Sequence, residues 1–363
     1  MTASLTDPKN YRERSVTLRV SGIEIPAAIT EPESMEPASA VLLVPGSLFC
    51  DVNGDFPVWH SRPRVYAYLA EQLAARGHVV YRFAKLGPET GSVVVDAAKA
   101  ADVQNWPGRV VIARAALAHF REALAAMKLS VLPTILAGHS EGAVVVSLTV
   151  HDEPSIRGVV LLSGPSVGLL DIMREQMVAT PPSAAQRDSL EAFDAVVAHI
   201  RRGEPTPDEL KQREGAGMLA SMDARGREYM RAVDAADPAL AIASVSQPVL
   251  IIQGGRDESV RPHHAQRLRE ARGGHPTTSL LFPELHHMYK NVPEGVVGPA
   301  ALGSKARPTS ALLMAWTRGS EELSAFDHFR SPPALVVFLR ACPFISCNRG
   351  TAGLCRGGRR IAR

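Results

Sequence analysis

The chain has 363 residues, of which 45% are hydrophobic and 21% charged, as is typical of a globular protein with a sizeable core. The formal net charge is +3, but six arginines and no acidic residue follow Ser331, so the rest of the chain carries about −3. This mildly acidic body argues against nucleic acid as the main partner, because nucleic-acid binding normally requires a basic face.

The sequence gives no sign of export or of a membrane span. The first residues contain no apolar run of the length of a signal peptide, and no stretch approaches the roughly 18 apolar residues of a spanning helix. Cys50 stands alone, and Cys342, Cys347 and Cys355 lie near the end of the chain, which is not a disulfide framework for a body of this size. We therefore expect a cytoplasmic protein.

Predicted strands and helices alternate along the first half of the chain. Residues 14–30 alternate apolar and polar side chains around Gly22, which is typical of an antiparallel hairpin. Short apolar runs then predict buried strands, and helical spacing predicts the helices between them. The strands are expected over residues 38–46, 78–84, 133–138 and 157–164, and the helices over 63–77, 108–128 and 141–151.

The alternation stops in the middle of the chain and then resumes. After a polar, helix-like stretch, apolar runs predict strands over 247–255 and 277–284 around a helix over 261–272. The two ends of the middle stretch thus return to the same sheet, which indicates an insertion. We expect a discontinuous core over residues 1–165 and 246–330, a helical cap over 166–245, and a basic tail of uncertain structure over 331–363.

This order of elements predicts the fold class. Strands that alternate with helices imply right-handed crossovers and a mainly parallel sheet with helices on both faces. The opening hairpin adds an antiparallel N-terminal edge. We therefore expect an α/β fold with a helical cap insertion.

Ser140 lies in the motif G-x-S-x-G at residues 138–142. Chance gives on the order of 0.2 such motifs in a chain of this composition, so the motif alone is weak, and a Gly-rich turn with an idle serine is the alternative. Its context is stronger, because a predicted strand enters the motif and a predicted helix leaves it, as in a nucleophile elbow. The helix that begins at Glu141 would offer its N–H groups to an oxyanion.

A serine nucleophile needs a base, and the base needs an orienting acid. Asp257 follows the strand predicted over 247–255, with Glu258 as its nearest rival, and His286 and His287 follow the next strand. All of these residues stand at the carboxyl ends of predicted strands, the edge where ligands bind in α/β sheets. The sequence therefore predicts a Ser-Asp-His site but leaves the choice between the two histidines open.

The loop after the strand at 38–46 is expected to complete the oxyanion hole. Gly46 permits a close approach of the backbone, so the N–H of Ser47 is the first choice of donor and that of Leu48 the second. Apolar side chains near this loop and on the cap are candidates for the substrate pocket, although packing within the protein explains them equally well. These candidates are Leu48, Phe49, Met173 and Met177, with Phe56 as a further possibility.

We expect no metal and no cofactor. The pairs His263-His264 and His286-His287 are adjacent on one backbone, and adjacent histidines seldom converge on one ion. No HExxH pattern or carboxylate-rich cluster accompanies them, and the cysteines near the end lack CxxC spacing.

Several segments together resemble the serine α/β-hydrolases, specifically the bacterial esterases with a GHSEG elbow that are related to serine aminopeptidase-like hydrolases. The matching segments span roughly residues 14–290 and read VLLVPGSLFCDVNGD, LAEQLAARGHVVYRFAKLG, LAGHSEGA, LLSGP, PVLIIQGGRD and FPELHHMYK. In two places the chain departs from the family: Pro45 replaces the usual histidine of the oxyanion loop, and the tail after Ser331 matches nothing.

The resemblance implies an α/β-hydrolase fold and assigns roles to individual residues. It implies Ser140 as the nucleophile, Asp257 as the orienting acid and His287, the second of its pair, as the general base. It also implies that the backbone N–H groups of Ser47 and Glu141 form the oxyanion hole.

From these observations we predict a carboxylic ester hydrolase that forms an acyl-enzyme from a small ester with a short or medium acyl group. A small peptidase or amidase with the same triad is the nearest alternative. A catalytically silent hydrolase fold that acts as a binding module is another. The oligomeric state is not predicted.

Overall fold

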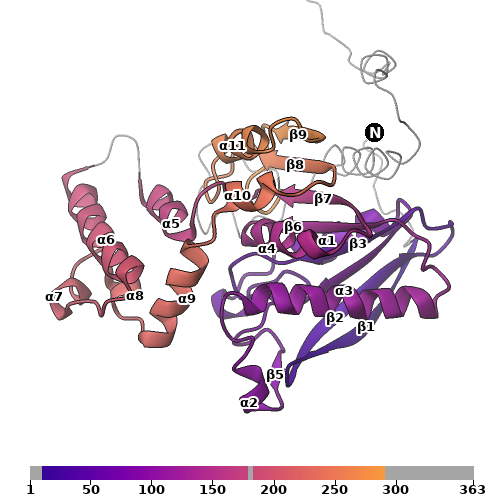
Figure 1. Ribbon diagram of the computed structural model, residues 1–363, viewed down its shortest axis with the longest axis horizontal. Helices are drawn as coiled ribbons and strands as arrows, with labels where there is room; N and C mark the ends of the chain where they lie inside the picture. Colours follow the sequence, from indigo (N-terminus) through magenta and orange to yellow (C-terminus); the bar gives the residue numbers. More distant parts are fainter. Residues whose placement is uncertain (1–9, 179–182, 291–363) are drawn as a thin grey trace, which may run out of the picture. The chain divides into compact units, whose positions relative to one another are not determined.

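The computed structural model describes residues 10–178 and 183–290, which all belong to the first of two compact units, Met1–Ser324. Within these residues nine strands form a single sheet (Figure 1). The strands are β1 (Tyr11–Val20), β2 (Ile23–Pro32), β3 (Ser39–Val44), β4 (His78–Phe83), β5 (Val93–Val94), β6 (Thr134–His139), β7 (Ile156–Leu162), β8 (Val249–Gly254) and β9 (Thr277–Phe282).

The sheet is mostly parallel with an antiparallel N-terminal edge. Its order is β1-β2-β4-β3-β6-β7-β8-β9, and β5 pairs with β2. The pairs β1–β2, β2–β4 and β2–β5 are antiparallel, whereas every pair from β4–β3 to β8–β9 is parallel. This arrangement confirms the predicted hairpin and sheet. Because parallel strands share one direction, the carboxyl ends of β3, β6, β8 and β9 meet at one edge.

The helices of the described residues include those expected over 63–77, 108–128, 141–151 and 261–272. The α-helices are α1 (Val65–Ala74), α2 (Ala97–Ala100), α3 (Gly108–Ala126), α4 (Glu141–Thr149), α5 (Leu169–Met177), α6 (Ala184–Arg202), α7 (Asp208–Lys211), α8 (Gly217–Ala220), α9 (Ala224–Asp234), α10 (Pro238–Ala243) and α11 (His263–Ala271). Two 3-10 helices, η1 (Pro57–Trp59) and η2 (Val150–Asp152), complete the set.

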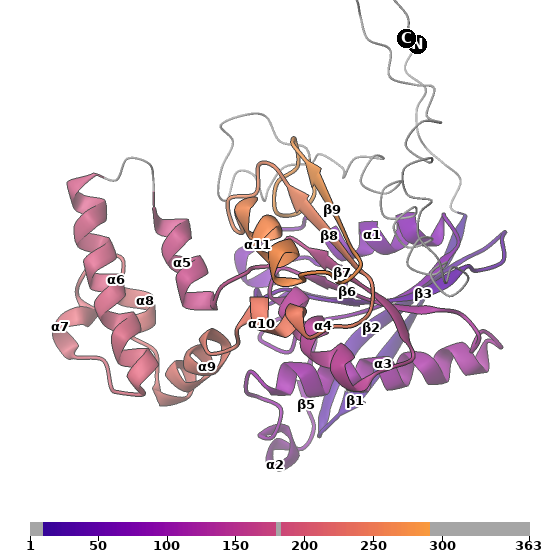
Figure 2. The same cartoon turned by 45° about the horizontal axis from the view of Figure 1, so that its top comes forward.

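Helices cover both faces of the sheet, as the packing of β3 shows. Leu42 packs with α3, α4 and α11 in one apolar cluster, whereas its neighbour Leu43 packs with α1 in another. Successive side chains of a strand point to opposite faces, so a strand with helices on both sides needs an unbroken apolar run. All six residues of β3 are accordingly buried. Figures 1 and 2 show α3 beside β1 and α4, on the first of these faces.

A segment of helices, α5 to α10, connects β7 to β8. Residues of α5 to α9 surround an apolar cluster of their own, which Trp106 and Val144 join from outside the segment. Helix α6 begins at a capping box of Ser183 and Gln186 and ends at Gly203, whose φ is 72°. These helices lie where a cap is expected, and the division into two domains stays a prediction.

Within the described ranges, no helix combines the length and the apolar character needed to cross a bilayer. The expected tail 331–363 and residues 291–330 of the expected core lie outside the described residues.

Candidate active site

Ser140 lies between β6 and α4 in a strained backbone conformation. Its φ of 55° and ψ of −126° are unfavourable for a residue with a side chain. The turn is so tight that both flanking positions require glycine. A Cβ at Gly138 would lie 2.1 Å from the carbonyl oxygen of Gly142, and one at Gly142 would lie 2.4 Å from that of Val44. The G-x-S-x-G spacing is therefore a steric requirement of this turn.

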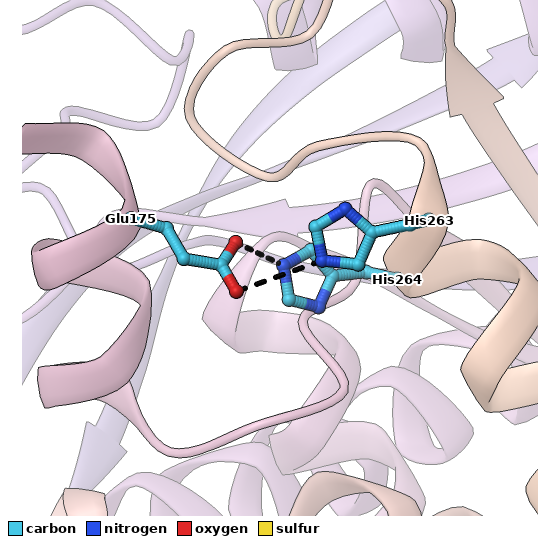
Figure 3. A group of neighbouring side chains, drawn as sticks. All are labelled: Glu175, His263 and His264. Atoms are coloured by element: carbon cyan, nitrogen blue, oxygen red, sulfur yellow. Dashed lines mark hydrogen bonds and ion pairs between the residues drawn. The ribbon is translucent and has the colours of Figure 1, made fainter. Parts of the chain in front are cut away.

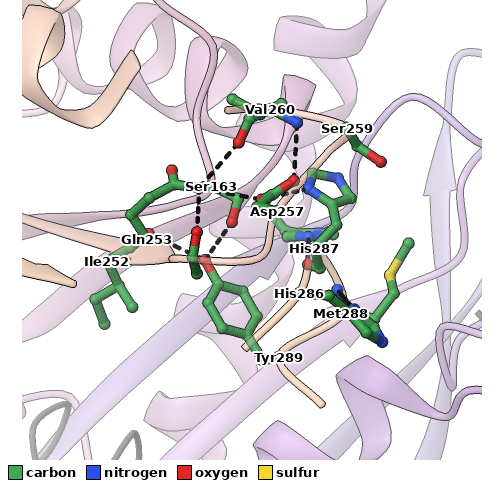
Figure 4. A network of polar contacts seen from close by, with 12 residues as sticks. Ser163, Ile252, Gln253, Asp257, Ser259, Val260, His286, His287, Met288 and Tyr289 are labelled. Carbon is green, nitrogen blue, oxygen red and sulfur yellow. Dashed lines mark hydrogen bonds and ion pairs between the residues drawn. The ribbon is translucent and has the colours of Figure 1, made fainter. Parts of the chain in front are cut away.

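Asp257 and His287 meet beyond the ends of β8 and β9 (Figure 4). The Nδ1 atom of His287 lies 2.9 Å from Oδ2 of Asp257, and both side chains are buried. The carboxylate accepts the Nδ1 proton, so the neutral ring keeps its lone pair at Nε2, where a general base needs it. His286 points elsewhere, and its Nδ1 atom accepts the N–H of Met288 at 2.8 Å.

Several donors hold Asp257 in its charged form. Oδ1 accepts the N–H of Val260 at 2.8 Å, and Oδ2 also accepts a hydrogen bond from Gln253 at 3.2 Å. Burial alone raises the pKa of the Asp257 carboxyl, but His287 and the hydrogen bonds from Val260 and Ser163 outweigh it and bring the pKa below its usual value. A charged Asp257 is what an orienting acid requires.

The loop that follows β3 lies against the elbow of Ser140. A Cβ at Gly46 would lie 3.1 Å from the Cβ of Ser140, and Ser47 and Glu141 line the same cavity as Ser140. Within the described parts of the chain, no hydrogen bond uses the N–H of Ser47 or that of Glu141. Both N–H groups are therefore available to an oxyanion. Leu48, the second choice of donor, does not line the cavity, and this residue is 39% exposed.

The carboxylate of Glu141 belongs to a buried charge cluster that was not predicted from the sequence. Oε1 accepts hydrogen bonds from Arg109 at 3.0 Å and from Trp106 at 3.1 Å, and Nζ of Lys85 lies 3.8 Å from Oε2. Burial raises the pKa of Glu141, but Lys85 and Arg109 more than reverse this shift. Burial and Arg109 together lower the pKa of Lys85 to about 7. Arg109 and Lys85 also donate to carbonyl oxygens of residues 45–47.

A cavity of about 50 Å³ opens next to Ser140 between the sheet edge and helices α5 and α9 of the segment that connects β7 to β8. Most of its wall is apolar, and its polar residues are Ser47, Ser140, Glu141 and Gln176. The apolar wall consists of Trp106, Val144, Pro165, Val167, Leu169, Ile172, Val233, Ala236, Pro238 and Val260.

The structure places the predicted pocket residues away from this wall. Leu48 and Phe49 are partly exposed, and the ring of Phe49 lies under Nζ of Lys85, 5.7 Å from it. Met173 and Met177 pack against the apolar cluster of the cap. None of these four residues is in contact with the cavity beside Ser140 as the structure describes it, and their role in substrate binding stays a prediction.

Only some of the residues that line the cavity could have been predicted from sequence patterns. Val144 lies one helical turn after Ser140, so it could have been placed there from spacing alone. Lys85, which belongs to the buried charge cluster and not to the cavity wall, follows β4 at the carboxyl edge of the sheet and could have been predicted there. Trp106 lies in an irregular connection whose course no periodicity predicts.

One group of side chains has the composition of a metal site (Figure 3). Nε2 of His264 lies 2.9 Å from Oε2 of Glu175, and Nε2 of His263 lies 3.5 Å from Oε1. However, the backbone N–H of Ser166 donates to Nδ1 of His264 at 3.2 Å, which places the proton of the neutral ring on Nε2. Because an ion would need the lone pair of Nε2, this donor set fits a metal poorly. The group instead joins cap helix α5 to α11.

Comparisons with known proteins agree with this architecture. The family model described as "Alpha/beta hydrolase family" matches residues 41–298. No curated protein sequence matches the chain. Among solved structures, the chain is similar to Est1E from Butyrivibrio proteoclasticus, with 16% identity and a TM-score of 0.51, over 86% of this chain and 99% of that one.

Two further structures show the same likeness. The proline iminopeptidase of Mycobacterium smegmatis is 18% identical, with a TM-score of 0.53 over 86% of this chain and 100% of that one. A fungal esterase of Rhizomucor miehei is 14% identical, with a TM-score of 0.50 over 88% and 85%. At such identities these likenesses concern the fold alone, and the α/β-hydrolase fold expected from the sequence is confirmed. Since the family model covers well over half of its residues, the chain belongs to the alpha/beta hydrolase family.

Proposed function

We propose that the protein is a carboxylic ester hydrolase with Ser140 as nucleophile, His287 as general base and Asp257 as orienting acid. The observation that carries this proposal is the buried contact of 2.9 Å between Asp257 and His287, at the sheet edge where β6 delivers Ser140. A base held in this tautomer by a charged carboxylate is what activation of a serine requires.

In the proposed reaction Nε2 of His287 takes the proton of Ser140 as Oγ attacks the ester carbonyl. The N–H groups of Ser47 and Glu141 stabilise the negative oxygen of the tetrahedral intermediate. His287 then gives its proton to the leaving alcohol, and water, activated by the same base, cleaves the acyl-enzyme. No metal or cofactor is required by these steps.

The cavity supports a short acyl group. Its volume is only about 50 Å³ and most of its wall is apolar, which suits a small apolar group better than a long chain. A peptidase that holds a free amino group would need an unengaged carboxylate in this wall. The acid in the described lining, Glu141, is already bound to Arg109 and Trp106, which favours an ester over a peptide substrate.

A panel of aryl esters and aminoacyl arylamides, together with labelling by a fluorophosphonate, tests this function. We expect the wild type to hydrolyse short-chain esters fastest and to be labelled at Ser140, and Ser140→Ala to do neither. Asp257→Asn should lower kcat by about 10⁴-fold, because the wrong histidine tautomer is then favoured.

Two results would contradict the proposal in different ways. Faster turnover of arylamides than of esters would favour the peptidase or amidase. A folded wild-type protein that is neither labelled nor active would favour a silent binding module.

A further inference from the structure

The polar backbone groups of Pro45 and Gly46 are fixed from two sides. Nη2 of Arg109 donates to the carbonyl oxygen of Pro45 at 2.6 Å, and the N–H of Gly46 donates to the hydroxyl of Tyr66 at 3.0 Å. These two groups belong to the same peptide unit, which is therefore held at both ends. Nη1 of Arg109 also donates to the carbonyl oxygen of Gly46 at 3.2 Å.

This last contact determines where the N–H of Ser47 points. A trans peptide unit is planar, and its C=O and N–H groups point in opposite directions. Because the C=O of Gly46 points at Arg109, the N–H of Ser47 in the same unit points away from Arg109. Ser47 lines the cavity next to Ser140, so this direction suits an oxyanion donor. The N–H of Gly46, bound to Tyr66, is not available for that task.

Tyr66 is itself held by His139, and the direction of each hydrogen bond follows from the partners. Nε2 of His139 lies 2.9 Å from the carbonyl oxygen of His287, which can only accept, so Nε2 carries the proton. Burial, reinforced by His287, lowers the pKa of His139 to about 3 and keeps the ring neutral. Nδ1 of His139 therefore accepts, and the hydroxyl of Tyr66 donates to it at 2.9 Å.

The result is one chain of hydrogen bonds from the oxyanion loop to the general-base loop. It runs from the N–H of Gly46 through Tyr66 and His139 to the backbone of His287. The rings of His139 and His287 lie 4.7 Å apart, centre to centre. Each link is made by a buried side chain, so water does not compete for these bonds.

Resting on the proposed function, we propose that Tyr66 and Arg109 are positioning residues that aim the N–H of Ser47 at the oxyanion. His139 and Glu141 flank Ser140 in the elbow. Their side chains hold those of Tyr66 and Arg109 in place through hydrogen bonds. We call the side chains of Tyr66, Arg109, His139 and Glu141 the clamp. The clamp holds the loop at Pro45, whose own side chain has no hydrogen-bond donor. Neither Tyr66 nor Arg109 touches the reacting atoms, and both act through the orientation of the peptide units around Gly46.

The chain contains a matched control for the variant Tyr66→Phe. Tyr81 is also a fully buried tyrosine whose hydroxyl lies 2.9 Å from Nδ1 of a histidine, His119. In both pairs the ring centroids are 5.7 Å apart. The pair of Tyr81 and His119 connects β4 to α3 and makes no hydrogen bond to the oxyanion loop. Tyr81→Phe thus removes a hydroxyl with the same kind of histidine contact and leaves the hydrogen bonds of Tyr66 and Arg109 unchanged.

The test measures kcat and KM for a short-chain ester and the inhibition constant of an alkyl boronic acid. The boron atom accepts an electron pair from Oγ of Ser140, and the tetrahedral adduct occupies the oxyanion hole. Tyr66→Phe should lower kcat roughly tenfold to a hundredfold, leave KM within about twofold, and weaken boronate inhibition by a factor similar to that in kcat. Tyr81→Phe should leave all three values near those of the wild type. Arg109→Lys, which cannot bind two carbonyl oxygens and a carboxylate in one plane, should repeat the pattern of Tyr66→Phe and serves if that variant does not fold.

Each outcome decides the proposal. An active wild type with a Tyr66→Phe variant of unchanged kcat would overturn it, and so would equal losses in Tyr66→Phe and Tyr81→Phe. A higher KM with an unchanged kcat would also overturn it, because substrate binding, and not stabilisation of the oxyanion, would then depend on Tyr66. A folded wild type without turnover or labelling of Ser140 would overturn the proposed function and this proposal together.

Discussion

At the scale of single residues, Glu141 contributes two separate groups. Its N–H is expected at the oxyanion, whereas its carboxylate balances Arg109 and Lys85 in a buried cluster. Sequence reasoning predicts the first role from the elbow motif and misses the second, because the two cations lie 32 and 56 positions away in the chain. A buried charge that loses its partner is costly, so the carboxylate should matter for folding as well.

Glu141→Gln isolates the carboxylate, because it keeps the backbone and a similar shape. We expect the free energy of unfolding to fall by about 3 kcal/mol, since the charge of Arg109 then remains buried without a counter-charge. Urea denaturation at neutral pH measures this loss. Asp194→Asn is the control, because its pair with Arg174 is exposed on both sides and should contribute less than about 1 kcal/mol. Equal losses in the two variants would contradict the assigned role of the cluster.

At the scale of elements, two neighbouring residues of helix α5 lie in different environments that the sequence does not distinguish. Ile172 lines the cavity, whereas Met173, the next residue, packs within the cap. Successive residues of a helix point about 100° apart, so only the docked position of α5 decides which of them faces the cavity beside Ser140.

Ile172→Ala should therefore enlarge the acyl site, and Met173→Ala should not. One methylene in an apolar pocket contributes about 1–3 kcal/mol to discrimination. We expect the ratio of kcat/KM for a hexanoyl ester to that for an acetyl ester to rise roughly tenfold in Ile172→Ala and to stay within twofold in Met173→Ala. The reverse result would show that the methionines predicted from the sequence, and not Ile172, contact the substrate.

The sequence predicted the sheet and the elbow because both obey local rules. Buried strands such as β3 need unbroken apolar runs, and a turn as tight as that around Ser140 needs Gly138 and Gly142. The cavity wall could not be predicted in the same way. Trp106 and Val233 reach it from a loop and from a helix far along the chain, and tertiary packing alone brings them together. The position of Asp257 against His287 rather than His286 likewise depends on the course of one loop.

At the scale of the whole molecule, several histidines are buried in neutral form. Burial lowers the pKa of His78 to about 4 and that of His139 to about 3, and burial also lowers the pKa of His264. In the unfolded chain each would titrate near 6.5. The unfolded state therefore binds more protons than the folded state below this pH, so acid favours unfolding.

We expect the free energy of unfolding to fall between pH 7 and pH 5, by about 2 kcal/mol for each of His78 and His139. The loss should begin near pH 6.5, the unfolded pKa, and should level off below about pH 4 for His78 and below about pH 3 for His139. Denaturant titrations across this range measure the slope, and His78→Gln should reduce it by the contribution of one histidine. A free energy of unfolding that is constant from pH 7 to pH 5 would contradict the assignment of neutral buried rings.

The positive φ of Ser140 has a consequence for the balance between activity and thermal stability. Glycine adopts such a conformation without strain, so Ser140→Gly should raise the melting temperature by a few degrees, in keeping with about 1 kcal/mol of relieved strain. Ser140→Ala keeps a Cβ and should not. If calorimetry shows the glycine variant to be the more stable of the two, the proposed nucleophile occupies a position at which the fold alone would favour glycine. Under the proposed function, selection for turnover and not for stability then keeps a serine at this position.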